Sequence, residues 1–143
     1  KMDNVFEEIR TALVRAFKGL FSAYDVFCEE IQRTDGAEDW IYIDMRPVGN
    51  QTVNRWHTDR QVFVDVAIHT ASEKNKAYYA IIPAVDGLIR PCFCFADRAI
   101  TVAEVGFRIE DKVLHATFSL AFRDSSPEPE SLPFMQELDT NIK

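Results

Sequence analysis

The alternation of side chains between Arg55 and His69 constrains the fold of this chain more than any other feature. From position 61 onward the residues divide into two sets that point in opposite directions: Val62, Val64, Val66 and Ile68 on one side, and Gln61, Phe63, Asp65, Ala67 and His69 on the other. A period of two is the pattern of a β-strand with one dry face. Residues 55–69 span fifteen positions, well beyond the usual ~5–6. We therefore expect a central strand that projects past its own domain toward a neighbour.

Two further stretches carry the same period. Trp40 to Arg46 alternates and is predicted to be a strand that stops before Pro47. Residues 47–54 contain Pro, Gly and Asn, so we expect a loop or hairpin connection there, which makes the strand antiparallel to the central one. Near the end of the chain, Asp111-Lys112 predicts a tight turn. A strand follows it, with one apolar face formed by Leu114, Ala116, Phe118, Leu120 and Phe122.

Two segments show helical spacing instead. Asn4 and Glu7 fit a capping box, and apolar residues at three-and-four spacing predict a helix from about Asn4 to a stop at Gly19. Ser72 is predicted to cap a second helix that runs to Leu88 or Ile89, with a kink at Pro83.

Shorter signals complete the prediction. We expect an edge strand at 24–28, a polar connection at 29–39, a compact apolar stretch at 91–95 and another strand at 100–107. The chain therefore predicts an α+β fold: a mixed, mostly antiparallel sheet of four to five strands with two helices packed mainly on one face.

Composition sets the domain organisation and excludes some partners. At 143 residues the chain is one domain's worth, and we assign residues 1–123 to a single α+β domain. Residues 124–143 hold five acidic and one basic side chain, so they carry −4 of the formal net charge of −7. We interpret this segment as an acidic extension whose apolar residues dock on this or another subunit: Leu132, Phe134, Met135 and Leu138. A chain this acidic is poorly suited to gripping nucleic acid.

The cysteines and the apolar runs indicate the compartment in which the chain is expected to work. Cys28, Cys92 and Cys94 form an odd set, and no leader resembles a secretory signal, so we expect a reducing cytosol and free thiols. The most apolar run, 77–89, is shorter than the ~20 residues a membrane span needs.

Candidate metal and catalytic chemistry is sparse. His57, His69 and His115 could form a metal site with Asp59 and Asp65, but their spacing is not that of a known site, so solvated or interface side chains are the favoured interpretation. For Cys92 and Cys94 we favour buried thiols that pack as small hydrophobic groups. Nucleophile-elbow, phosphate-loop and dinucleotide motifs are all missing from the sequence. We therefore expect no enzyme activity, no cofactor and no metal.

Arg46, Arg55 and Arg60, together with Trp56, are the candidate surface site. Arginine and aromatic residues commonly anchor interfaces, so this group could meet acidic residues of a neighbouring subunit, such as Glu128 and Glu130. An alternative remains open, in which these arginines pair within the chain with Asp39, Asp44 and Asp59. Phe63 is either part of the interface or lies beneath a helix.

The order of these segments resembles that of the tail terminator, or tail-completion, proteins of long-tailed bacteriophages and prophages. The resemblance covers residues 2–123 and rests on three stretches: Val5-Phe6-Glu7-Glu8-Ile9, Arg46-Pro47-Val48, and the hairpin strand from Ile109 to Arg123. The hairpin strand is the most specific of these. The family more often has Gly where Lys112 stands, and it lacks a proline like Pro83.

The resemblance implies a structural protein of the virion that assembles in the bacterial host cytoplasm. Proteins of this family form a six-subunit ring on the head-proximal end of the tail, stop polymerisation of the tail tube and present the surface that joins the head. The implied partners are copies of the chain itself, the tail tube protein and a connector or head-closure protein. DNA would pass through the ring without specific binding. Another neck protein, or a small-ligand-binding α+β domain, remains the alternative.

Overall fold

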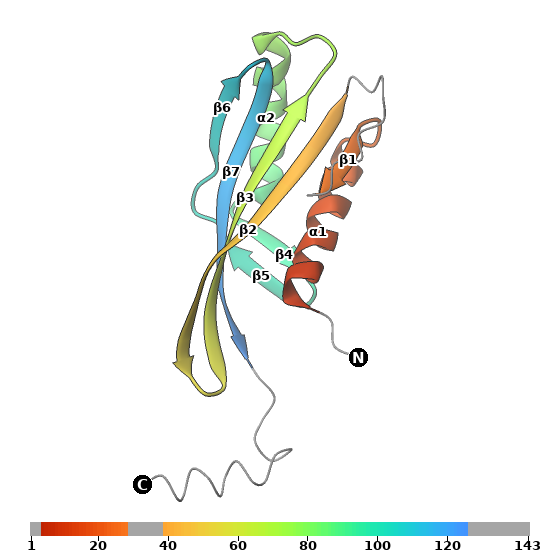
Figure 1. Ribbon diagram of the computed structural model, residues 1–143. Helices are drawn as coiled ribbons and strands as arrows, with labels where there is room; N and C mark the ends of the chain where they lie inside the picture. The colour runs from red at the N-terminus through yellow and green to blue at the C-terminus, as the bar shows by residue number, and fades with distance from the viewer. Residues whose placement is uncertain (1–3, 29–38, 126–143) are drawn as a thin grey trace, which may run out of the picture.

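The computed structural model describes residues 4–28 and 39–125. A five-stranded sheet of order β1-β2-β3-β7-β6 forms the body, with β3 at its centre, and β4 and β5 form a separate small sheet (Figure 1). The elements, in chain order, are α1 (Val5–Leu20), β1 (Asp25–Cys28), β2 (Trp40–Asn54), β3 (His57–His69), α2 (Asn75–Ile89), β4 (Cys92–Phe95), β5 (Arg98–Thr101), β6 (Gly106–Glu110) and β7 (Val113–Ser125).

The main sheet is mixed but mostly antiparallel, as the sequence predicts. Only β1 and β2 run parallel; β2–β3, β3–β7 and β6–β7 are antiparallel pairs. Both helices lie on the same side of this sheet (Figure 1). The α+β class and the central position of β3 are confirmed, whereas the small β4–β5 sheet was not predicted.

The core lies between the helices and one face of the sheet. Each helix contributes three buried residues at helical spacing: Ile9, Leu13 and Phe17 from α1, and Tyr78, Val85 and Ile89 from α2. The sheet contributes the alternating residues of its three long strands, and the predicted dry faces of β3 and β7 are both buried: Val62, Val64, Val66, Ile68, Leu114, Ala116, Phe118, Leu120 and Phe122.

The first helix starts with a cap that differs in part from the predicted capping box. Oδ1 of Asn4 accepts a hydrogen bond of 2.7 Å from the backbone N–H of Phe6. The carboxylate of Glu7 instead pairs with Arg10, one turn further along the helix, at 3.3 Å. The helix ends one residue beyond the predicted stop, at Leu20.

The strand predicted to stop before Pro47 does not stop there. β2 continues through Pro47 to Asn54, and Arg55 and Trp56 alone form the turn into β3. Proline is tolerated because β2 is an edge strand at this point, where a missing N–H costs no ladder hydrogen bond. Residues 47–54 are therefore half of a long hairpin and not a loop.

The second helix begins later than predicted. Lys74 stands at its N-cap position without a side-chain hydrogen bond, and the helix starts at Asn75. Ser72 lies in the preceding turn, where its Oγ accepts from the backbone N–H of Lys74 at 3.5 Å. Pro83 lies inside one continuous helix, so the sequence pattern was correct in keeping a single helix there.

The predicted strand at 100–107 is two strands. Arg98–Thr101 pairs with β4, whereas Gly106–Glu110 pairs with β7 in the main sheet. Residues 102–105 between them have no strand assignment. The loosely alternating stretch that was predicted as one strand is therefore divided between two different sheets.

A single tyrosine ties the second helix to the sheet. The hydroxyl of Tyr78, which is fully buried, donates to the backbone oxygen of Lys112 at 2.7 Å and accepts from the backbone N–H of Thr70 at 3.2 Å. Asp111 and Lys112 adopt φ values of 53° and 64°, which confirms the predicted tight turn. The helix, the end of β3 and the β6–β7 turn are thereby held together.

Candidate assembly interface

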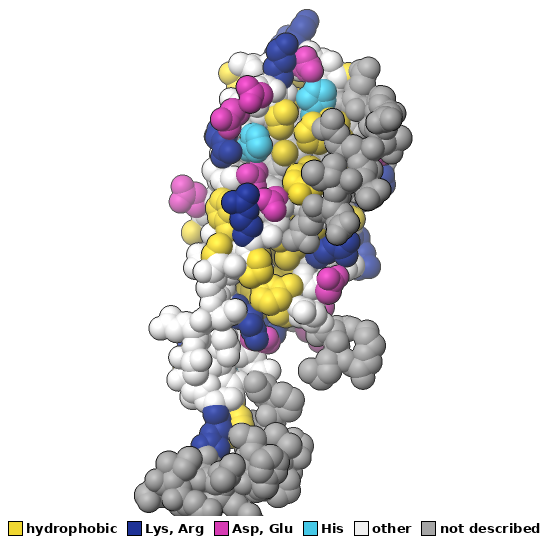
Figure 2. Space-filling view, viewed as in Figure 1, with side chains coloured by type: hydrophobic (Ala, Val, Ile, Leu, Met, Phe, Trp, Pro, Cys, Tyr) yellow, Lys and Arg dark blue, Asp and Glu magenta, His cyan; other side chains and the backbone are white. Residues whose placement is uncertain are grey.

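The sheet has a second face, turned away from the helices, which we call the open face. It carries the alternate residues of β2, β3 and β7, including Tyr42, Arg46, Phe63, Asp65 and His115, and these are exposed or only half-buried. Histidine, acidic and basic side chains interleave with hydrophobic ones over this face (Figure 2). Phe63 therefore lies beneath neither helix of the described residues. The open face has the mixed aromatic and charged composition of a protein contact surface.

Two histidines on the open face, His69 and His115, each pair with a carboxylate. His69 Nε2 lies 2.9 Å from Glu73 Oε2 and stacks on Trp40 at 5.3 Å between ring centroids. Its hydrogen bond lowers the pKa of Glu73 below the ordinary value, with Lys112 adding to the effect. His115 Nδ1 lies 3.2 Å from Asp65 Oδ1. Within residues 4–28 and 39–125, no three His, Cys, Asp or Glu side chains gather closely enough to hold a metal ion.

Below the body of the sheet, three strands continue as a projecting ribbon formed by residues 47–54, 57–61 and 121–125 (Figure 1). Every residue from 46 to 55 is exposed, and Val48 and Val53 are 55% and 41% exposed. Figure 2 shows the lower part of the ribbon as mostly white, the colour of the backbone and of uncharged polar side chains, with a basic side chain at its tip. The predicted central strand does project beyond the helix-covered body, but it begins at His57, because Arg55 and Trp56 form the hairpin turn.

A β-bulge at Val48 decides which side chains of the ribbon face which way. Before the bulge, Met45 pairs with Val64 on the core side; after it, Gln51 pairs with Asp59 on the open side. One extra residue exchanges the two faces of β2 relative to β3. No pattern in the sequence marked this change, because residues 47–54 had been interpreted as a loop.

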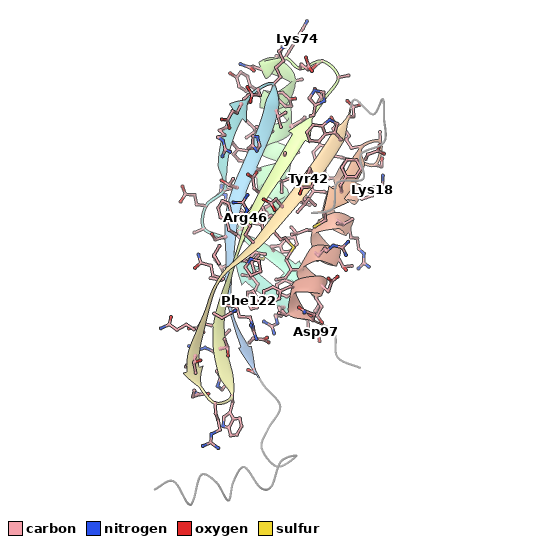
Figure 3. All side chains as sticks on the ribbon, in the orientation of Figure 1. Lys18, Tyr42, Arg46, Lys74, Asp97 and Phe122 are labelled. Atoms are coloured by element: carbon pink, nitrogen blue, oxygen red, sulfur yellow. The ribbon has the colours of Figure 1, made fainter. Side chains whose placement is uncertain are left out.

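The structure does not gather the four candidate residues into one patch. Arg46 lies on the open face opposite Phe63 and bonds Asp44, with Nε 2.9 Å from Oδ2. Arg55 stacks on Trp56 at 5.0 Å in the hairpin turn. Arg60 points to the other face of the ribbon, where it lies over the ring of Phe6 at 5.7 Å. Figure 3 shows Arg46 on the body of the sheet, well above the hairpin tip.

The intramolecular pairing that the sequence left open is realised in part. Arg46 pairs with Asp44 as considered, whereas Asp59 pairs with Arg123 at 2.9 Å and Asp39 accepts from the backbone N–H of Ala71 at 2.8 Å. The hydrogen bond from Arg123 holds the pKa of Asp59 below its ordinary value. These two side chains also line a hollow of about 530 Å³ on the ribbon.

Asp124 is the acidic residue that sequence reasoning missed. Its carboxylate accepts from Arg98 at 2.7 Å and from Arg60 at 3.0 Å, so it joins β5 and β3 to β7. Arg98 also lies over the ring of Phe122 at 5.1 Å. Partial burial acts to raise the pKa of Asp124, but the hydrogen bonds from Arg98 and Arg60 outweigh it and the pKa is lowered. The sequence did offer one signal for this contact. If the predicted strand continued past Arg123, Asp124 would lie beside the central strand β3.

The cysteines divide between two environments. Cys28 is buried, but Cys92 and Cys94 are exposed on β4, so the prediction of buried thiols there is wrong. The alternate residues of that strand, Phe93 and Phe95, fill the core instead. The apolar arm residues predicted to dock, Leu132, Phe134, Met135 and Leu138, lie outside the described residues, as do Glu128 and Glu130.

The comparisons with known proteins point to one family. No helix in the described part of the chain is both long and apolar enough to cross a membrane. A family model described as phage tail terminator protein matches residues 8–131. No curated protein gives a significant match to the sequence. The match includes most of α1, the whole sheet and the ribbon.

Proposed function

Because this chain belongs to the phage tail terminator family, we propose that it caps the tail tube, stops its polymerisation and forms the surface that joins the tail to the head. Membership makes it a structural component of the phage tail. The finer role places it at the head-proximal end of the virion tail, after assembly in the bacterial host cytoplasm.

The single observation that carries this proposal is the exposed ribbon that the sheet extends beyond its helix-covered body. A long two-stranded hairpin with a third strand beside it costs chain length and exposes Val48 and Val53 to water. Such an extension is useful when it contacts another molecule. A terminator must contact copies of itself, the tail tube protein and a connector or head-closure protein, so large contact surfaces are what the role requires.

The charge of the subunit suits a ring through which DNA passes. The formal net charge is −7, and a channel surrounded by acidic subunits repels a moving duplex, whereas a basic one would hold it. The ring, which we propose to be a hexamer, therefore carries no specific DNA site.

We also propose that the protein is not an enzyme and needs no cofactor. The titratable side chains on its open face are engaged in pairs such as His69–Glu73 and His115–Asp65, which is the arrangement of structural ion pairs.

Electron microscopy of particles made after disruption of the gene tests the function. Loss of a terminator gives overlong or unjoined tails beside filled heads. Loss of another neck protein, such as a head-closure protein or connector adaptor, gives leaking heads beside tails of normal length. Particles with tails of normal length firmly joined to heads would overturn the proposal.

A further inference from the structure

We propose that neighbouring copies in the ring join edge to edge: the outer edge of β2, residues 47–54, pairs with the outer edge of β7, residues 118–122, of the next copy. This inference rests on the proposed ring and names the surface that closes it. The partner is a second copy of this chain, bound through backbone hydrogen bonds of one continuous sheet.

The outer edge of β2 is open along the ribbon. β1 pairs with β2 only from Trp40 to Ile43, and no other described strand lies beside β2 beyond that point. Figure 1 shows the lower half of β2 with no strand along its outer side. An unpaired strand edge presents a row of N–H and C=O groups that can template another strand.

The opposite edge of the sheet opens at a corresponding place. β6 covers β7 only from Val113 to Thr117, so Phe118 and the residues after it have no described strand on that side. A hollow of about 350 Å³ lies beside this point, lined in part by Phe63, Gly106 and Ser119. Strand addition commonly combines such an edge with a pocket for an incoming side chain. At Arg123 the edge is occupied, because Arg98 donates to its backbone oxygen at 3.2 Å.

The side chains along these two edges lack the charged residues that usually prevent exposed strand edges from pairing. Proteins protect exposed edges with charged residues, proline and bulges. Charged residues make up 27% of the chain, yet none occurs between Pro47 and Asn54 or between Phe118 and Phe122. Edge strand β6, by contrast, carries the Arg108–Glu110 ion pair at 3.0 Å. Pro47 and the bulge at Val48 interrupt the start of the β2 edge, and a second register shift lies between Thr52 and Asn54, which leaves residues 49–52 as the regular stretch for pairing.

The strand directions fit a closed ring. β2 and β7 are each antiparallel to β3, so they run parallel to each other. A rotation about an axis along the strands preserves strand direction, and the joint between β2 and the next β7 is then parallel. Two different edges meet in this joint, which is the head-to-tail arrangement that a cyclic ring requires. A two-fold dimer would instead pair β2 with β2 of its partner, antiparallel.

Disulfide trapping on isolated tails tests the joint. We start from the C92S/C94S variant, which removes the two exposed native thiols. Gln51 lies opposite Asp59, and Asp59 lies opposite Arg123, so Gln51 shares its face of the sheet with Ala121 and Ser119. Gln51→Cys is therefore combined with Ser119→Cys or with Ala121→Cys. On oxidation, one of these pairs should give a ladder of cross-linked multimers that reduction returns to monomer.

The matched control combines Thr52→Cys with Ala121→Cys, which face opposite sides and should give no ladder. Dimers from Gln51→Cys alone would show a two-fold joint and overturn the inference. Tails that carry the protein but yield no cross-link with either pair would also overturn it, with the edge then covered by residues 29–38 or 126–143 or by another tail protein. Absence of the protein from tails would overturn the proposed function itself, so the two failures are distinguishable.

Discussion

Asp124 of β7 forms ion pairs with one arginine of β3 and one arginine of β5, so its carboxylate links three strands. It accepts hydrogen bonds from Arg60 of β3 and Arg98 of β5, and it is itself part of β7. Arg60 also reaches the ring of Phe6 in α1. A carboxylate shared by two arginines is costly to remove, because both cations would lose their acceptor in a partly buried site.

Replacing Asp124 with Asn should destabilise the protein by about 1–3 kcal/mol at pH 7, since the charged hydrogen bonds to Arg60 and Arg98 become neutral ones. The folded-state pKa of Asp124 lies below its ordinary value of 3.8. Its contribution is therefore complete above that value and is lost as the pH falls through the lowered pKa. Urea midpoints of wild type and variant should differ at neutral pH and converge in acid.

The control is Asp97→Asn, a change at an exposed carboxylate in the turn between β4 and β5. It should leave the free energy of unfolding within about 0.5 kcal/mol of wild type at both pH values. A difference for Asp124→Asn that is as large in acid as at neutral pH would contradict the electrostatic account.

At the scale of the element, two prolines show that a local sequence rule does not decide where a strand or a helix ends. Pro47 was interpreted as the end of a strand, but β2 passes through it, and no described strand pairs with its outer side there. Pro83 lies inside α2 and the helix nevertheless continues to Ile89. Buried residues on both sides of Pro83, such as Tyr78 and Val85, hold the helix on the core. Packing thus overrides the loss of one helical hydrogen bond.

Pro83→Ala should therefore stabilise the protein by up to about 3 kcal/mol, because it restores a helical N–H at an exposed position and removes the clash with the preceding turn. Urea unfolding monitored by circular dichroism measures the change. Ala84→Gly, at the neighbouring exposed position, should lower stability by about 1 kcal/mol and shows that the measurement responds to helix propensity. Unchanged stability of Pro83→Ala would mean that the helix is already adapted to the proline.

At the scale of the whole molecule, the helices cover one face of the sheet and leave three surfaces for partners: the open face, the ribbon and the two strand edges. The candidate residues distribute among them, with Arg46 and Phe63 on the open face and Arg55 and Trp56 at the ribbon tip. A protein in a tail needs several partners at once. Separate surfaces on one subunit would let the proposed ring neighbour and the proposed axial neighbour bind together.

Truncation after Ser126 tests the predicted arm. We expect the far-ultraviolet circular dichroism spectrum and the thermal midpoint to stay close to wild type, because the described core lies within residues 4–28 and 39–125. We expect incorporation into tails to be lost, because the apolar residues from Leu132 to Leu138 would no longer dock on a neighbour. Immunoblots of isolated tails measure incorporation. Normal incorporation of the truncated protein would remove the arm from the assembly mechanism.

The sequence by itself determined the elements with one dry face. The alternation in β3 and β7 and the three-and-four spacing in α1 identified those segments and their buried residues, because a side-chain period is a local property that burial on one side imposes directly. It also determined the Asp111-Lys112 turn, because the backbone conformation of a tight turn depends on only these two neighbouring residues. The edge position of β1 followed from its short length.

Only the tertiary structure decided which residues meet across the sheet. Asp124 finds Arg60 and Arg98 at sequence separations of 64 and 26 residues, and no local pattern encodes such a pair. Cys92 and Cys94 face water because Phe93 and Phe95 take the inner side of β4. Pro47 stays in a strand because its outer neighbour is missing there, and the bulge at Val48 then turns Gln51 to the open side. These outcomes depend on partners distant in the chain, which the fold alone brings together.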